Sequence, residues 1–140
     1  HLNFSTDRRR CNLDKGIRDR VFPYIAGILK NLRAPALKIG GADEHIHILF
    51  RLPKDISLMQ IILKVKSNSS RFIKGLDGHH DTFAWQTGYY AVGVPPSALE
   101  NVKMYIQNQE EHHLTESYRD EMLRRLREDN ADIDESKIWD

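Results

Sequence analysis

Cysteine is almost absent from this chain, in which Cys11 is the one thiol among 140 residues. An internal disulfide and a cysteine-based zinc site each need more than one cysteine, so both are excluded. Long apolar runs are missing as well, since no stretch approaches the roughly 20 apolar residues of a membrane-spanning helix. No signal peptide is recognisable, and no internal repeat is apparent. These absences predict a cytoplasmic protein without a membrane span.

Net charge is also small, because 21 basic and 20 acidic residues leave +1. The distribution is uneven: residues 1–40 hold nine basic and three acidic side chains, whereas residues 101–140 hold six and eleven. A basic first part is compatible with a phosphate backbone as partner, although ordinary solvated helix surfaces have similar charge. We predict one domain over residues 1–140, with a loosely ordered acidic tail from about residue 128.

Hydrophobic periodicity predicts alternating strands and helices. Strands are expected at 1–6, 36–39, 44–52 and 83–94 (irregular around Gly88), and helices at 14–31, 57–73, 98–113 and 118–126. Gly40-Gly41 is expected to form a turn or bulge. Asp14 is the expected N-cap of the first helix, and Ser97 with Glu100 has the capping-box spacing. This order predicts an α+β, ferredoxin-like (RRM-like) antiparallel sheet with helices on one face and the other face left for a ligand or partner.

The strand at 44–52 carries His45 and His47 in alternate positions. Side chains two apart on a strand point to the same face, so the imidazoles project side by side while Ile46 and Ile48 face the other way. Two neutral imidazoles on one rigid surface are two ligands of a metal site. For a single histidine, a half-buried position on the sheet is the commoner explanation.

Tyr105 and Gln109 lie four residues apart on the helix at 98–113 and therefore share a face. The amide oxygen of Gln109 suits a hard cation such as Mg²⁺ or Mn²⁺, and the phenol of Tyr105 can attack phosphorus once it loses its proton. If this helix packs beside the histidine strand, His45, His47 and Gln109 hold the metal, with His112 as the rival third ligand. The alternative is a packed interfacial tyrosine and a solvated glutamine.

Together these motifs resemble those of the HUH single-tyrosine transposases, small enzymes of bacterial insertion sequences (insertion sequence 200-like, TnpA-type). His45-Ile46-His47 is similar to their histidine–hydrophobe–histidine (HUH) signature. The segment 105–113, placed after 85–89 and 95–97, looks like their tyrosine helix. The resemblance implies the HUH version of the ferredoxin-like fold, with Tyr105 as nucleophile and His45, His47 and Gln109 as ligands of Mg²⁺ or Mn²⁺.

The same resemblance implies that single-stranded DNA with hairpin, palindromic ends is cleaved and rejoined through a 5′-phosphotyrosine. The protein would act as a homodimer, with the active site assembled in cis or in trans. Basic residues of the first half would contact the DNA backbone. The candidates are Arg8, Arg9, Arg10 and Lys66.

Three other functions fit the same residues. A plasmid relaxase or replication initiator shares the HUH chemistry, but relaxases are generally longer and often carry a third histidine. A domesticated palindrome-processing HUH nuclease would have the same active site. A non-catalytic nucleic-acid-binding module on a ferredoxin-like sheet predicts that Tyr105→Phe changes nothing and that no covalent adduct forms.

Overall fold

The computed structural model describes residues 1–7, 12–76, 80 and 82–128. One four-stranded sheet, ordered β2-β3-β1-β4, runs through the middle of the molecule, and each neighbouring pair of strands is antiparallel. The strands are β1 (Leu2–Ser5), β2 (Ala36–Ala42), β3 (His45–Phe50) and β4 (Tyr90–Ala91). The helices are α1 (Lys15–Asn31), α2 (Leu58–Lys74), the short 3₁₀ turn η1 (Pro96–Ala98), α3 (Leu99–Gln107), α4 (Gln109–Thr115) and α5 (Tyr118–Glu128).

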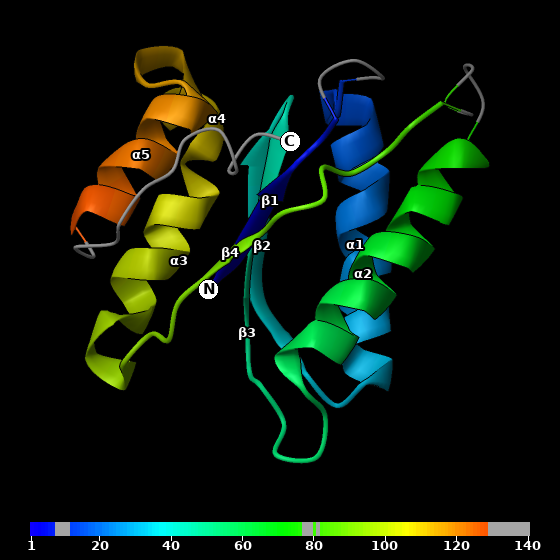
Figure 1. Ribbon diagram of the computed structural model, residues 1–140, viewed down its shortest axis with the longest axis horizontal. Helices are drawn as coiled ribbons and strands as arrows, with labels where there is room; N and C mark the ends of the chain where they lie inside the picture. The colour runs from blue at the N-terminus through cyan, green and yellow to red at the C-terminus, as the bar shows by residue number, and fades with distance from the viewer. Residues whose placement is uncertain (8–11, 77–79, 81, 129–140) are drawn as a thin grey trace.

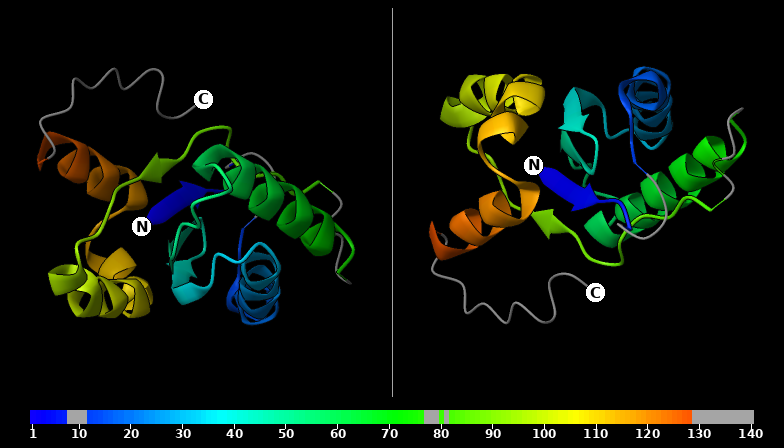
Figure 2. Two further views of the ribbon diagram at one scale, coloured as in Figure 1. Left: turned by 90° about the horizontal axis from the view of Figure 1, so that it is seen from below. Right: turned by 90° about the horizontal axis from the view of Figure 1, so that it is seen from above.

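Helices cover both faces of this sheet. Figure 1 shows α1 and α2 on one side and α3, α4 and α5 on the other, and the two views of Figure 2 agree. The α+β class and the antiparallel ferredoxin-like sheet are therefore confirmed. The face that the sequence analysis leaves open is instead covered by the C-terminal helices, because they too have apolar side chains to bury, among them Ile106, Tyr118 and Met122. Within the described ranges no helix is long and apolar enough to cross a bilayer.

The main core lies between the sheet and the pair α1 and α2. Phe4 of β1 is paired with Ile46 of β3, and Leu2 with Ile48. These four side chains are almost completely buried against α1 and α2. The predicted alternation on β3 is thus observed: the isoleucines face the apolar core, and the histidines between them face α3, α4 and α5.

Of the two helix caps that the sequence predicts, one is present and the other is absent. The side chain of Asp14 accepts a hydrogen bond from the backbone N–H of Ile17 (3.0 Å), as predicted for the N-cap of α1. Ser57 and Gln60 form a full capping box at α2. The capping box predicted at Ser97 is wrong, because the chain there forms a 3₁₀ turn and α3 begins at Leu99 without a side-chain cap.

The expected turn at Gly40-Gly41 is also wrong, since both glycines lie inside β2 and the chain reverses at 43–44. Gly40 is opposite His47 in the sheet. A Cβ at Gly40 would lie 2.3 Å from the carbonyl oxygen of Ile106 on α3, which is too close for any side chain. Glycine here therefore serves the close approach of α3 to the sheet rather than a turn.

The predicted helix over 98–113 is interrupted at Asn108, which separates α3 from α4. At the break, the side-chain amide of Gln109 donates to the carbonyl of Tyr105 (3.2 Å). The last predicted strand is short, as β4 spans two residues and an isolated bridge joins Thr6 to Trp85. Between these two pairings the chain is irregular around Gly88, as expected.

Candidate active site

His45 and His47 lie on β3 with both side chains fully buried. On the neighbouring strand β2 their partners are Ala42 and Gly40, and these small residues let α3 and α4 approach the imidazoles. Tertiary packing thus brings α3, which begins at Leu99, onto the histidine face of the sheet.

Tyr105 and Gln109 lie directly over this face. The amide oxygen Oε1 of Gln109 is 2.8 Å from His45 Nε2, in a buried contact. The ring of Tyr105 stands perpendicular to that of His47, with centroids 5.7 Å apart. Segments sixty positions apart in sequence therefore meet within one chain.

Arg18 fixes α4 in this position. Its side chain is buried, and its guanidinium donates to the carbonyl of Leu13 and to the carboxylate of Asp43, each at 2.8 Å. The same group reaches Glu110 of α4, also at 2.8 Å. One buried arginine thus ties the start of α1, the β2–β3 turn and α4 together next to Gln109.

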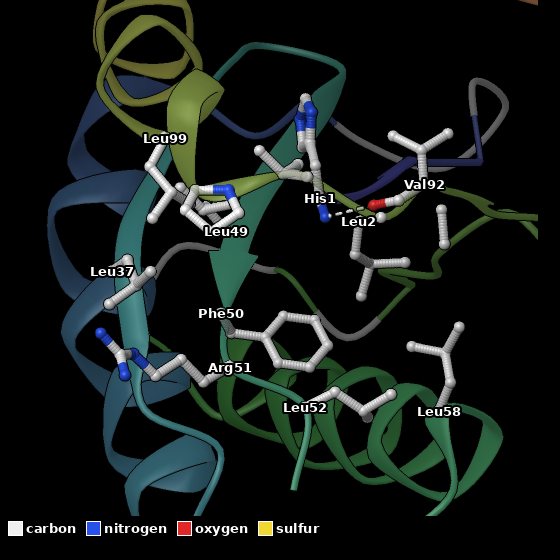
Figure 3. Close-up of a pocket in the computed structure, with 14 residues that line it drawn as sticks. His1, Leu2, Leu37, Leu49, Phe50, Arg51, Leu52, Leu58, Val92 and Leu99 are labelled. Atoms are coloured by element: carbon white, nitrogen blue, oxygen red, sulfur yellow. Dashed lines mark hydrogen bonds between the residues drawn. The ribbon is translucent and has the colours of Figure 1, made fainter.

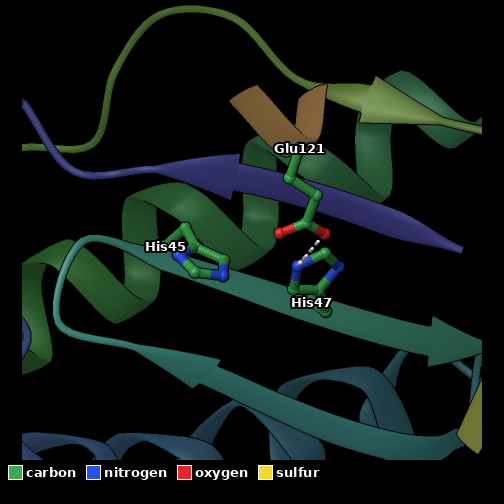
Figure 4. A group of neighbouring side chains, drawn as sticks. All are labelled: His45, His47 and Glu121. Carbon is green, nitrogen blue, oxygen red and sulfur yellow. Dashed lines mark ion pairs between the residues drawn. The ribbon is translucent and has the colours of Figure 1, made fainter. Parts of the chain in front are cut away.

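Glu121 of α5 is a further member of the group, which the sequence analysis missed. Figure 4 shows its carboxylate above the two histidines. One ligand atom from each of His45, His47 and Glu121 can be chosen so that all lie within 4.8 Å of one another. The hydroxyl of Tyr105 donates to the carboxylate of Glu121. The available signal was an acid three residues after Tyr118 and next to Met122, on the buried side of an amphipathic helix.

Burial controls the charges in this group. It holds the pKa of His47 well below its ordinary value. Positive charge on the neighbouring His45, Arg125 and His112 lowers this pKa further. Burial also raises the pKa of Glu121 to about 7. His47 Nδ1 lies 2.8 Å from His1 Nε2. Its other nitrogen, Nε2, is buried, has no hydrogen-bond partner in the described part of the chain and faces Glu121 at 3.5 Å.

Comparison with known families gives this arrangement a context. A family model described as "Transposase IS200 like" matches residues 1–109, more than three quarters of the chain. The chain belongs to the IS200-like transposase family. A comparison with curated proteins found no match.

Two solved structures have the same fold as this chain. One is a proposed transposase from Deinococcus radiodurans R1, with 17% identity and a TM-score of 0.57, covering 78% of this chain and 88% of the other. The second is a REP-associated tyrosine transposase bound to a REP hairpin, with 14% identity and a TM-score of 0.60, covering 84% of this chain and 67% of the other. At these identities the similarity shows the fold.

The remaining predicted residues lie elsewhere. Nε2 of His112 is 3.0 Å from Glu116 and 3.9 Å from Glu121, so this imidazole lies at the edge of the group. Lys66 is on the opposite side of the sheet, where its ammonium donates to the carbonyls of Gln86 (2.8 Å), Thr87 (3.3 Å) and Gly88 (2.8 Å). Burial lowers the pKa of Lys66 to about 8. Arg8, Arg9 and Arg10 fall outside the described residues.

A largely apolar cavity of about 620 Å³ adjoins the candidate active site. Figure 3 shows it between the end of β3 and the starts of α2 and α3, with Phe50, Leu52 and Leu99 among its walls. His1 lines the cavity and also contacts His47, so the cavity ends beside the histidine pair. Its volume is within the range of small-molecule sites.

Proposed function

We propose that this chain cleaves and rejoins single-stranded DNA at insertion-sequence ends, with Tyr105 as the nucleophile. The observation that carries the proposal is the position of Tyr105: its ring is 5.7 Å from that of His47, and its hydroxyl is bonded to the carboxylate that faces the same imidazole. Membership of the IS200-like transposase family supports the reaction class.

The chemistry requires a nucleophile that stays attached to the DNA. The Tyr105 hydroxyl loses its proton as its oxygen attacks phosphorus, the bond from phosphorus to the 3′ oxygen breaks, and the 3′ oxygen takes up a proton to leave as a hydroxyl, so that protons balance. The products are a 5′-phosphotyrosine and a free 3′ end. Because the phosphotyrosine ester conserves the bond energy, a 3′-hydroxyl can later attack it and rejoin the strands without ATP.

The residues around Tyr105 fit a divalent metal ion. His45 and His47 offer imidazole nitrogens, and Gln109 offers an amide oxygen of the kind that Mg²⁺ and Mn²⁺ bind. His47 Nε2 supports the fit, because it is buried without a hydrogen-bond partner among the described residues. A bound cation would neutralise the charge that develops on the phosphodiester.

The proposed partners are hairpin DNA ends and a second copy of the chain. The neighbour solved with a REP hairpin supports a hairpin substrate. Arg8, Arg9, Arg10 and Lys66 stay proposed backbone contacts, although DNA would compete with the internal bonds of Lys66. A domesticated palindrome-processing enzyme would use the same chemistry on hairpins of its host genome.

The test is a denaturation-resistant complex between the protein and labelled single-stranded hairpin DNA in Mg²⁺ or Mn²⁺. Wild type should form it with a label placed 3′ of the cut, on the strand whose 5′ phosphate is bound to Tyr105, and chelation by EDTA should abolish it. Tyr105→Phe should bind the hairpin but form no complex. His47→Ala should also keep hairpin binding and lose cleavage. Tyr24→Phe is the matched control and should behave as wild type, because this ring stacks on Phe72 of α2, on the other side of the sheet from Tyr105.

A complex that survives Tyr105→Phe would show that another residue is the nucleophile. A wild type that binds hairpins without ever forming an adduct would favour the non-catalytic binding module.

A further inference from the structure

We propose that Glu121 of α5 is a further ligand of the active-site metal, supplied by the same chain as His45 and His47. The inference rests on the proposed function, because it assumes that a metal is bound there. It deepens that function by assigning a catalytic role to a helix that lies beyond the family match, which ends at residue 109.

The distances support ligation. His47 Nε2 and Glu121 Oε1 are 3.5 Å apart. When His45 is included, one ligand atom from each of the three residues lies within 4.8 Å of the other two. Two adjacent ligands of an octahedral Mg²⁺, each about 2.1 Å from the ion, are roughly 3 Å apart, and two opposite ligands are roughly 4.2 Å apart. Small side-chain movements would therefore bring all three groups onto one ion.

The burial of Glu121 points the same way. The residue is only 1% exposed, and a buried carboxylate is costly unless a cation or several donors compensate it. Its closest side-chain partners are the Tyr105 hydroxyl and the imidazole of His47. The positive charges of Arg125 and Arg124 act on this carboxylate as well, and a divalent ion between Glu121 and the histidines would add positive charge in direct contact with it.

The first turn of α5 is anchored at the histidines. The ring of Tyr118 stacks on His45, with centroids 4.5 Å apart, and its hydroxyl donates to Asn3 of β1 at 2.9 Å. Glu121 follows three residues later and therefore lies on the same face of the helix. Arg125, one turn further, lies over the ring of Tyr105 at 4.8 Å. Helix α5 thus contacts both the metal-binding side chains and the nucleophile.

A simpler role for Glu121 would be to accept the Tyr105 hydrogen bond and nothing else. The two roles differ in metal affinity, which can be measured without DNA and without turnover. If Glu121 only holds the phenol, its removal should leave Mn²⁺ binding unchanged. If it is a ligand, binding should weaken even though Tyr105 is intact.

The experiment is a titration of the DNA-free, full-length protein with Mn²⁺, followed by electron paramagnetic resonance. Glu121→Ala and Glu121→Gln should each raise the dissociation constant by more than about 100-fold, the upper end of what outer-shell changes alone produce. His47→Ala is the reference for a lost ligand. Asp120→Asn removes the same charge from an exposed neighbouring position of α5 and should bind as wild type.

The outcomes separate this inference from the proposed function. Wild-type Mn²⁺ affinity in both Glu121 variants, with weakened binding in His47→Ala, would overturn the ligand role of Glu121 alone. Wild-type affinity in His47→Ala as well would overturn the metal site on which both proposals depend. Melting curves followed by circular dichroism identify any variant that fails to fold, and if Glu121→Ala does, the near-isosteric Glu121→Gln decides the matter.

Discussion

Substituting Gly40 by alanine should separate the two halves of the candidate site without altering any proposed functional residue. Gly40 is paired with His47 across the sheet and lies under α3. An added Cβ would be 2.3 Å from the Ile106 carbonyl oxygen and 2.8 Å from its Cγ2. Because the nearest obstacle is backbone, a change of rotamer cannot relieve the contact, and α3 must move away from β2.

The size of the effect follows from the geometry. Restoring even the 3.0 Å that real Cβ atoms respect requires the gap to widen from 2.3 Å by several tenths of an ångström. Overpacking of this kind costs about 1–3 kcal/mol, and a backbone obstacle places Gly40→Ala near the upper value. For a chain of this size that lowers the melting temperature by roughly 10 °C. Since Tyr105 is next to Ile106, misplacement on the order of 1 Å should also slow adduct formation about 100-fold.

Thermal and urea denaturation measure the stability, and the rate of covalent complex formation measures the activity. Gly27→Ala is the matched control, because a Cβ at this position in the interior of α1 meets nothing within 4 Å. It should stabilise the protein by about 0.4–1 kcal/mol, since alanine restricts the unfolded chain and favours the helix. A Gly40→Ala protein as stable and as fast as wild type would refute the tight approach of α3 to the sheet.

Three further predictions test other contacts. Because Tyr105 and His47 of one chain lie side by side, a mixture of Tyr105→Phe and His47→Ala proteins should form no adduct; recovery of activity would show that the tyrosine acts on the partner's histidines. Burial lowers the pKa of Lys66 from 10.5 to about 8, so between these pH values the unfolded chain binds more protons and stability should rise with pH. Urea midpoints should show this rise in wild type and lose it in Lys66→Met. Asp14→Ala should cost about 1 kcal/mol in urea denaturation by removing the N-cap of α1, whereas Asp14→Ser should retain most of that stability.

Local patterns in the sequence predicted the fold and two of the side-chain pairs well. A strand repeats every two residues, so the alternation at 45–48 was enough to assign the histidines and isoleucines to opposite faces of β3. The spacing of Tyr105 and Gln109 predicted a shared face, which survives the helix break at Asn108 because the Gln109 amide caps the Tyr105 carbonyl. These are short-range regularities of the backbone.

The errors at Gly40 and Ser97, and the omission of Glu121, have a different origin. Gly-Gly permits both a turn and a close helix contact, and only the position of Ile106, more than sixty residues away, selects the second. In the sequence, Glu121 is one of eleven acidic residues in 101–140. What distinguishes it is its burial, which results from the packing of α5 over β3. The sequence by itself determined which groups face together on each strand and helix, because that depends on backbone period. Which elements then meet, and so which carboxylate joins the histidines, was decided by long-range packing, which no local spacing encodes.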